Sequence, residues 1–109
     1  MNNEEARNSN LREMILRILQ AQRLKGAILA GGWLVELNLR KMLDQQGFPI
    51  SAEELEVFVD YLVEEHAIEK KRLNDEPPYT YKIKLLARGI RHLEGSEHIP
   101  GVGVTWGAP

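Results

Sequence analysis

The spacing of apolar residues in this chain changes character once, and that change limits the folds available to it. Apolar residues repeat with a helical period over 11–19, 35–43 and 55–63, which predicts three amphipathic helices. From residue 68 onward the pattern alternates, over 68–72 and again over 79–85. Alternation on both sides of a proline-containing loop is typical of a β-hairpin. The order therefore predicts a mainly helical α+β domain that ends in a small hairpin.

Capping and breaking residues set the boundaries of these elements. We place the first helix at 11–24, with Asn10 as its N-cap, and the second at 33–46. Ser51 followed by Glu54 has the spacing of a capping box, which predicts that the third helix begins there.

The two ends of the chain differ from its centre in composition. Residues 1–10 are polar, and we expect a flexible N-terminus. After the hairpin, LLARGIRHLEG predicts a short closing helix, and residues 96–109 are rich in Gly and Pro. We therefore expect one domain over 11–95, followed by an extended C-terminal tail at 96–109.

The size and composition exclude several classes of protein. A chain of 109 residues fits one small domain, and its net charge of -2 shows no strong overall attraction to nucleic acid or membrane. The lack of cysteine excludes a disulfide scaffold, a thiolate zinc site and a cysteine nucleophile. The polar start is unlike a signal peptide, and no apolar run approaches the roughly 20 residues of a membrane span. We expect a cytoplasmic protein without membrane contact.

No pattern in the sequence predicts catalysis. His66, His92 and His98 lack the spacing of metal ligands, and His66 is expected to be partly buried at the end of the third helix. The run GVGVTWG has no predicted strand before it and no predicted helix after it, unlike a phosphate-binding loop. We therefore expect a non-enzymatic protein with no catalytic residue, metal site or cofactor.

The second half of the chain resembles winged-helix domains. LEVFVDYLVEEHAIEKK is similar to their third helix and first wing strand, and YKIKLLARGIRHLEG to their second wing strand and closing helix, with Gly89 and Leu93 at matching places. The resemblance implies a winged helix-turn-helix fold: three helices, a two- or three-stranded wing and a short C-terminal helix. ARGIRHLEG together with IPGVGV resembles small winged-helix proteins of Mu-like phages and prophages over about residues 11–104. That narrower resemblance implies a phage or prophage setting and no particular activity.

The third helix is negatively charged, which is unusual for a helix that reads DNA. Its predicted outer face has no basic residue, so phosphates would be repelled there. Exposed valine and tyrosine side chains rimmed by carboxylates suit a protein contact better, and a merely solvated acidic face is the alternative. We assign to a protein-interaction face Val57, Asp60, Tyr61, Glu64 and, from the tail, Trp106.

Positive charge gathers in the hairpin and just after it. The residues concerned are Lys70, Lys71, Arg72, Lys82, Lys84, Arg88 and Arg91. We expect these cations to contact the backbone of double-stranded DNA, weakly and with a steep dependence on salt. The alternative is that lysines at a hairpin edge only prevent strands of different molecules from pairing.

Two functions therefore remain open. One is a DNA-binding transcription regulator that uses its wing. The other is an interaction module that associates with itself or with another phage protein and does not bind DNA through its third helix.

The tail bears on self-association. It carries Ile99, Val102, Val104 and Trp106, and it can fold back on its own domain or lie across a second copy. We expect a homodimer whose contact is the tail, the first helix or the Val57–Tyr61 face, with a monomer as the alternative.

Overall fold

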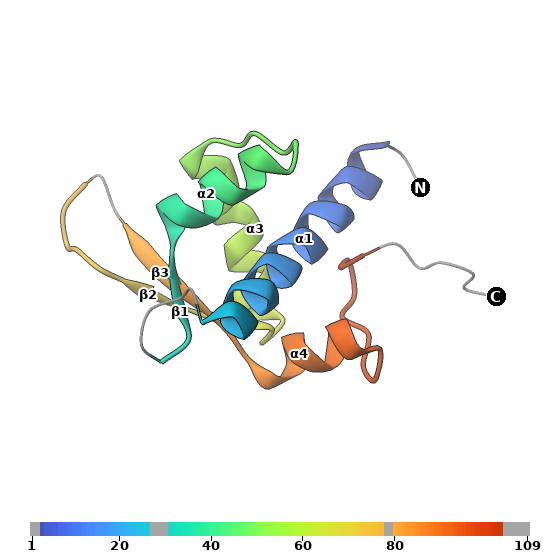
Figure 1. The fold of residues 1–109 in the computed structure, drawn as a ribbon. Coiled ribbons are helices and arrows are strands. Elements are labelled where there is room, and N and C mark those ends of the chain that lie inside the picture. The colour runs from blue at the N-terminus through green and yellow to red at the C-terminus, as the bar shows by residue number, and fades with distance from the viewer. Residues whose placement is uncertain (1–2, 27–30, 78–79, 104–109) are drawn as a thin grey trace.

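The computed structural model describes residues 3–26, 31–77 and 80–103, and every structural statement below concerns these residues. They form four helices and one three-stranded antiparallel sheet, which confirms the predicted α+β class (Figure 1). The elements in chain order are α1 (Asn3–Lys25), β1 (Trp33–Val35), α2 (Glu36–Gln45), α3 (Ala52–Glu64), β2 (Ile68–Arg72), β3 (Tyr81–Leu85) and α4 (Ala87–Glu94).

Helix α1 is longer than the sequence predicts. It begins at Asn3, so Asn10 lies inside the helix and is not its N-cap, and the predicted start at residue 11 is wrong. Two features account for the extension. Glu4 and Glu5 place negative charge in the first turn, where it interacts favourably with the helix dipole and stabilises the helix. Ser9 is buried against the C-terminal segment, which supplies contacts that no local pattern reveals.

The start of the second predicted helix is a strand. Trp33–Val35 pairs with β3, with Leu34 opposite Ile83, and α2 begins only at Glu36. Leu34 is buried, so this short strand contributes to the core. Pairing across the sheet thus overrides the helical period that places residues 33–35 in α2. The sheet has the order β1-β3-β2, within the two or three strands expected.

The third helix and the hairpin agree with their predictions. The Ser51 hydroxyl accepts a hydrogen bond from the Glu54 backbone N–H at 3.1 Å, which confirms the N-cap. Helix α3 ends in a left-handed turn at His66, whose φ is 59°. His66 is exposed there, so the expectation of a partly buried His66 is wrong. Strands β2 and β3 pair along their length, from Ile68 opposite Leu85 onward; Tyr79 lies outside the described residues.

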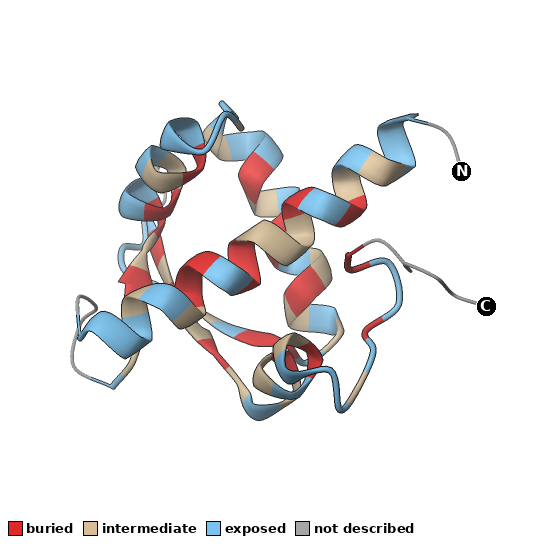
Figure 2. Cartoon of the chain, turned by 45° about the vertical axis from the view of Figure 1, so that its right-hand side comes forward, coloured by how far each residue is buried: buried red, intermediate tan, exposed pale blue. Residues whose placement is uncertain are grey.

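The sheet has one face toward the helices and one toward solvent. Along β3, Tyr81, Ile83 and Leu85 are buried, whereas Lys82 and Lys84 point to the other face. Helix α1 packs against α2, α3, α4 and β3 and carries much of the core (Figures 1 and 2). Among the described helices, none is both long and apolar enough to span a bilayer.

Residues 96–103 fold back onto their own domain. Ile99 and Val102 are fully buried in the common core, and Gly103 hydrogen-bonds through its backbone to Ser9 in α1. Of the two alternatives for the tail, this part lies on its own domain rather than across a neighbour. The folded unit therefore extends past residue 95, at least to Gly103; Val104 and Trp106 lie outside the described residues.

Candidate nucleic-acid interface

The outer face of α3 only partly retains the surface predicted from the sequence. Val57 is 68% exposed, and Glu53 and Glu64 are exposed beside it. Tyr61, however, is half-buried, and its hydroxyl donates a hydrogen bond to the Pro100 carbonyl at 2.6 Å. Tyr61 therefore holds the C-terminal segment. The prediction that it forms an open contact surface with Val57 is wrong.

Tyr61 is also engaged from its ring side. The Arg12 guanidinium carbon lies 3.9 Å from the centre of the Tyr61 ring, and Arg12 Nη1 donates to the Gly101 carbonyl at 3.0 Å. The tail, α1 and α3 thus meet at one stacked pair. Trp106, also assigned to the interaction face, lies outside the described residues.

Lys70 does not belong to a basic surface. It is on the inward side of β2, its side chain is 18% exposed, and its Nζ lies 2.6 Å from Glu56 and 2.9 Å from Asp60. Burial acts to lower the pKa of Lys70, but the hydrogen bonds to Glu56 and Asp60 outweigh burial, so this pKa is raised. Lys70 and Asp60, predicted to serve different partners, neutralise each other.

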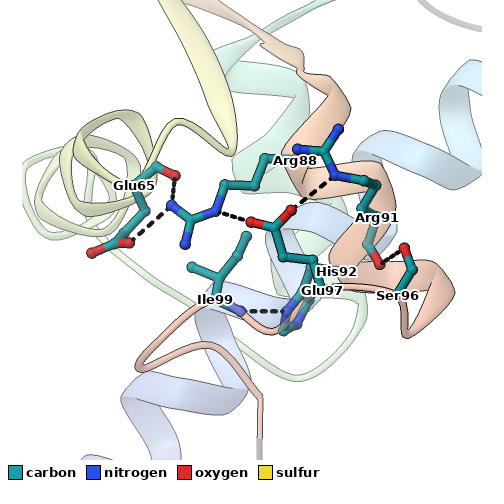
Figure 3. Close-up of polar contacts among 7 residues, drawn as sticks. All are labelled: Glu65, Arg88, Arg91, His92, Ser96, Glu97 and Ile99. Carbon is teal, nitrogen blue, oxygen red and sulfur yellow. Dashed lines mark hydrogen bonds and ion pairs between the residues drawn. The ribbon is translucent and has the colours of Figure 1, made fainter.

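Arg88 and Arg91 both bind the tail, although half of the Arg91 side chain stays exposed. Both guanidinium groups bind the carboxylate of Glu97, and Arg88 also donates to the backbone carbonyl and the carboxylate of Glu65 at the end of α3 (Figure 3). Hydrogen bonds from Arg91 and then Arg88 hold the pKa of Glu97 below its ordinary value. Arg88 therefore ties α4 to α3 and to the tail, and Arg91 ties α4 to the tail. Their assignment to a DNA contact stays a prediction.

His92 completes this attachment. Its ring is buried, Nδ1 accepts the backbone N–H of Ile99 at 3.1 Å, and Nε2 lies 3.2 Å from a carboxylate oxygen of Glu13 (Figure 3 shows the bond to Ile99). An Nδ1 that accepts leaves the proton on Nε2, where it can donate to Glu13. Both ring nitrogens of His92 thus have partners within the folded domain. Within the described residues, no group of three His, Cys, Asp or Glu side chains could hold a metal ion.

The remaining predicted lysines meet on the outer face of the sheet. Lys71 in β2 is directly opposite Lys82 in β3, and Lys84 is opposite Trp33 in β1. Lys82 Nζ lies 4.7 Å and Lys84 Nζ 5.8 Å from the centre of the Trp33 indole. We call Trp33, Lys71, Lys82 and Lys84 the outer-sheet patch.

The outer-sheet patch keeps its positive charge. Within the described part of the chain, no carboxylate forms an ion pair with its three lysines, although Glu69 stands opposite Lys84 in the register. Arg72 follows Lys71 and so falls on the other face of the strand, opposite Tyr81. Of the seven cations assigned from sequence, the fold brings together Lys71, Lys82 and Lys84.

Trp33 is the residue that the sequence assignment missed. The sequence places it in a helix, whereas the strand β1 sets it on the outer face beside two lysines. The available signal was the local run Gly-Gly-Trp-Leu-Val, in which an aromatic and a β-branched residue favour a strand.

Comparisons with known proteins add no relationship to this picture. No protein-family model, no curated protein and no solved structure matches the chain.

Proposed function

We propose that this chain is a non-enzymatic winged-helix domain that binds the phosphate backbone of DNA through its outer-sheet patch, as a regulator of transcription. The order of elements supports the fold part of the proposal, because three helices are followed by a hairpin and a closing helix. The third strand, β1, fits the three-stranded form of the wing. The proposed relationship to phage or prophage proteins is supported by the similarity of the segments ARGIRHLEG and IPGVGV to such proteins.

One observation carries the DNA-binding part. Lys71, Lys82 and Lys84 gather on one face without an ion-pair partner among the described residues, while Lys70 of the same hairpin is paired with Glu56 and Asp60. Unpaired surface lysines attract phosphates through charge alone, without reading bases.

The distribution of acidic residues also favours a DNA contact on the sheet. The inward face of β2 meets α3 through the pairs from Lys70 to Glu56 and Asp60, so the outer-sheet patch looks away from α3. Nucleic acid on the outer face therefore avoids the exposed Glu53 and Glu64 and meets Glu69, which lies opposite Lys84. We therefore assign the DNA contact to the outer face of the sheet and not to the third helix.

Charge-reversal variants of the full chain test this proposal. We expect Lys82→Glu/Lys84→Glu to weaken binding to a short labelled DNA duplex at low salt by about ten-fold or more. Lys25→Glu/Lys41→Glu makes the same change in net charge at exposed positions on α1 and α2, and should bind within about two-fold of the parent. With three phosphates neutralised, the plot of log affinity against log salt should have a slope of roughly −2.7.

Two outcomes would contradict the proposal. Equal losses in both double variants would mean that net charge, and not the outer-sheet patch, governs binding. Tight sequence-specific binding that ignores Lys82 and Lys84 would mean that α3 reads the DNA despite its acidic face.

A second candidate is self-association through α1. Leu24, in the last turn of α1, is 74% exposed beside a shallow groove between α1 and α4. The groove is lined by Arg17, Gln20, Ala21, Leu24, Leu93 and Glu94. We propose a second copy as the occupant, because the groove offers an apolar side chain, an apolar floor and a charge of each sign to a two-fold partner.

Sedimentation of the full chain at micromolar concentration separates this candidate from a monomer. A dimer that Leu24→Glu dissociates and Leu37→Glu leaves intact would support it, since Leu37 is 46% exposed on a different helix. A parent chain that sediments as a monomer would end the self-association candidate and leave DNA binding unaffected.

A further inference from the structure

We infer that the outer-sheet patch stacks an unpaired base on Trp33, so that its favoured ligand is a single-stranded stretch of nucleic acid. The inference rests on the proposed phosphate contact and adds a contact to a base. It changes the expected ligand from a duplex, whose bases are stacked on one another, to a strand with base faces free.

Trp33 lies on the outer face of the sheet, away from the core. Its neighbour Leu34 points into the core and is buried, while Trp33 points to the outer face and stays half-exposed. Core packing therefore does not account for an aromatic residue as large as tryptophan at this place. Strand β1 is also at the edge of the sheet, so among the described residues no strand pairs with its other side.

The backbone at Gly31 lies close to the edge of the Trp33 indole. Gly31 adopts a φ of +84°, and a Cβ built on it would lie 3.2 Å from Cδ1 and 3.3 Å from Nε1 of Trp33. The backbone of Gly31 therefore runs along the edge of the indole, which a side chain at this position would disturb. This contact restricts the ring on one side, so stacking costs the side chain less conformational freedom than it would cost an unrestricted one.

Positive charge lies beside the Trp33 ring. Lys82 and Lys84 both approach the Trp33 indole, and Lys71 lies opposite Lys82 on the next strand. An aromatic ring with lysines beside it is a combination with which proteins bind single strands: the ring stacks on a base, and the ammonium groups bind the flanking phosphates. The flexible lysine side chains can move from the indole to phosphates as a base arrives.

The intrinsic fluorescence of Trp33 provides a direct test. The chain has two tryptophans, so Trp106→Phe leaves Trp33 as the sole one and changes none of the four residues of the outer-sheet patch. We expect oligothymidylate to quench this fluorescence at low salt, and a duplex of the same length to cause little quenching. Labelled DNA in the same titrations should show at least about five-fold tighter binding of the single strand.

Substitutions of Trp33 separate stacking from charge. Trp33→Phe keeps an aromatic ring and should retain most of the preference for the single strand, whereas Trp33→Leu should lose about ten-fold in affinity for oligothymidylate. Duplex binding should change by less than about two-fold in both variants, because the three lysines remain. Thermal melting followed by circular dichroism checks that each variant is folded, and the quenching test stands without either of them.

The possible outcomes distinguish this inference from the function on which it rests. Quenching with a preference for the single strand supports both. Binding of the two ligands with equal affinity and without quenching overturns the stacking of a base and leaves the phosphate contact standing. If neither ligand binds at low salt, both proposals fall.

Discussion

Substituting Gly101 by alanine tests whether the C-terminal segment is part of the folded domain. Gly101 has a φ of +73°, in the left-handed region, and a Cβ at this position would overlap the Tyr61 hydroxyl. It would also lie 3.1 Å from Nη1 of Arg12. Tyr61 and Arg12 are the side chains that bind the carbonyls of Pro100 and Gly101, so the substitution acts on the attachment of the tail.

The expected loss of stability has two parts. A left-handed alanine costs about 1–2 kcal/mol relative to glycine. Displacing Tyr61 from the Pro100 carbonyl costs about 0.5–1.5 kcal/mol more, the usual net contribution of one hydrogen bond. Gly47→Ala is the matched control, because Gly47 has a φ of +87° and nothing within 4 Å of the added Cβ. Gly47→Ala has the backbone cost alone, so the difference in the free energy of unfolding between the two variants measures the contribution of the tail contacts.

Urea denaturation followed by circular dichroism measures that difference. Gly101→Ala should unfold at a lower urea concentration than Gly47→Ala, with an excess loss of about 0.5–1.5 kcal/mol, or roughly 2–12 °C in melting temperature. In a Tyr61→Phe background the excess should shrink, because the hydroxyl that the new methyl group meets is gone. Equal midpoints for Gly101→Ala and Gly47→Ala would refute the reasoning, since they would mean that the tail adds nothing to the folded state.

Three further predictions concern the contacts around α4 and the sheet. Gly89→Ala should lower the melting temperature, although glycine to alanine usually stabilises a helix by about 1 kcal/mol, because the new Cβ would lie 2.6 Å from a backbone carbonyl oxygen. The tie from Glu97 to Arg91 and Arg88 lowers the carboxyl pKa from 4.5, so its contribution to stability is present above pH 4.5 and is lost as pH falls through the lower folded value. Glu97→Gln should therefore melt below the parent at neutral pH and approach it in acid; a constant gap in melting temperature would contradict this. Tyr81→Phe should change the free energy of unfolding by less than about 1 kcal/mol or raise it, because the buried hydroxyl has no hydrogen-bond partner among the described residues; a clear loss in urea denaturation would reveal a partner.

Where a structural element depends on nearby residues, the sequence by itself determined it. Helix α3 is an example, since Ser51 caps it and its apolar stripe is buried as predicted. The hairpin is another, because alternation over 68–72 matches the paired strand β2. In both cases the partners are close along the chain, so composition and spacing carry the information.

Only the tertiary structure decided which surfaces stay open. Tyr61 is on the outer side of α3 as its period predicts, but Pro100, distant in sequence, covers its hydroxyl. Lys70 alternates correctly along β2 and yet pairs with two carboxylates of α3.

The same limit applies to the two ends of the chain and to Trp33. Ser9 bonds to Gly103 across 94 positions, which extends both α1 and the folded unit beyond their predicted ends. Trp33 becomes part of a strand because β3 is available to pair with it. Periodicity predicts which side of an element is apolar. It does not predict which segment packs against that side, because that choice depends on contacts between residues far apart in sequence, which form only when the chain folds.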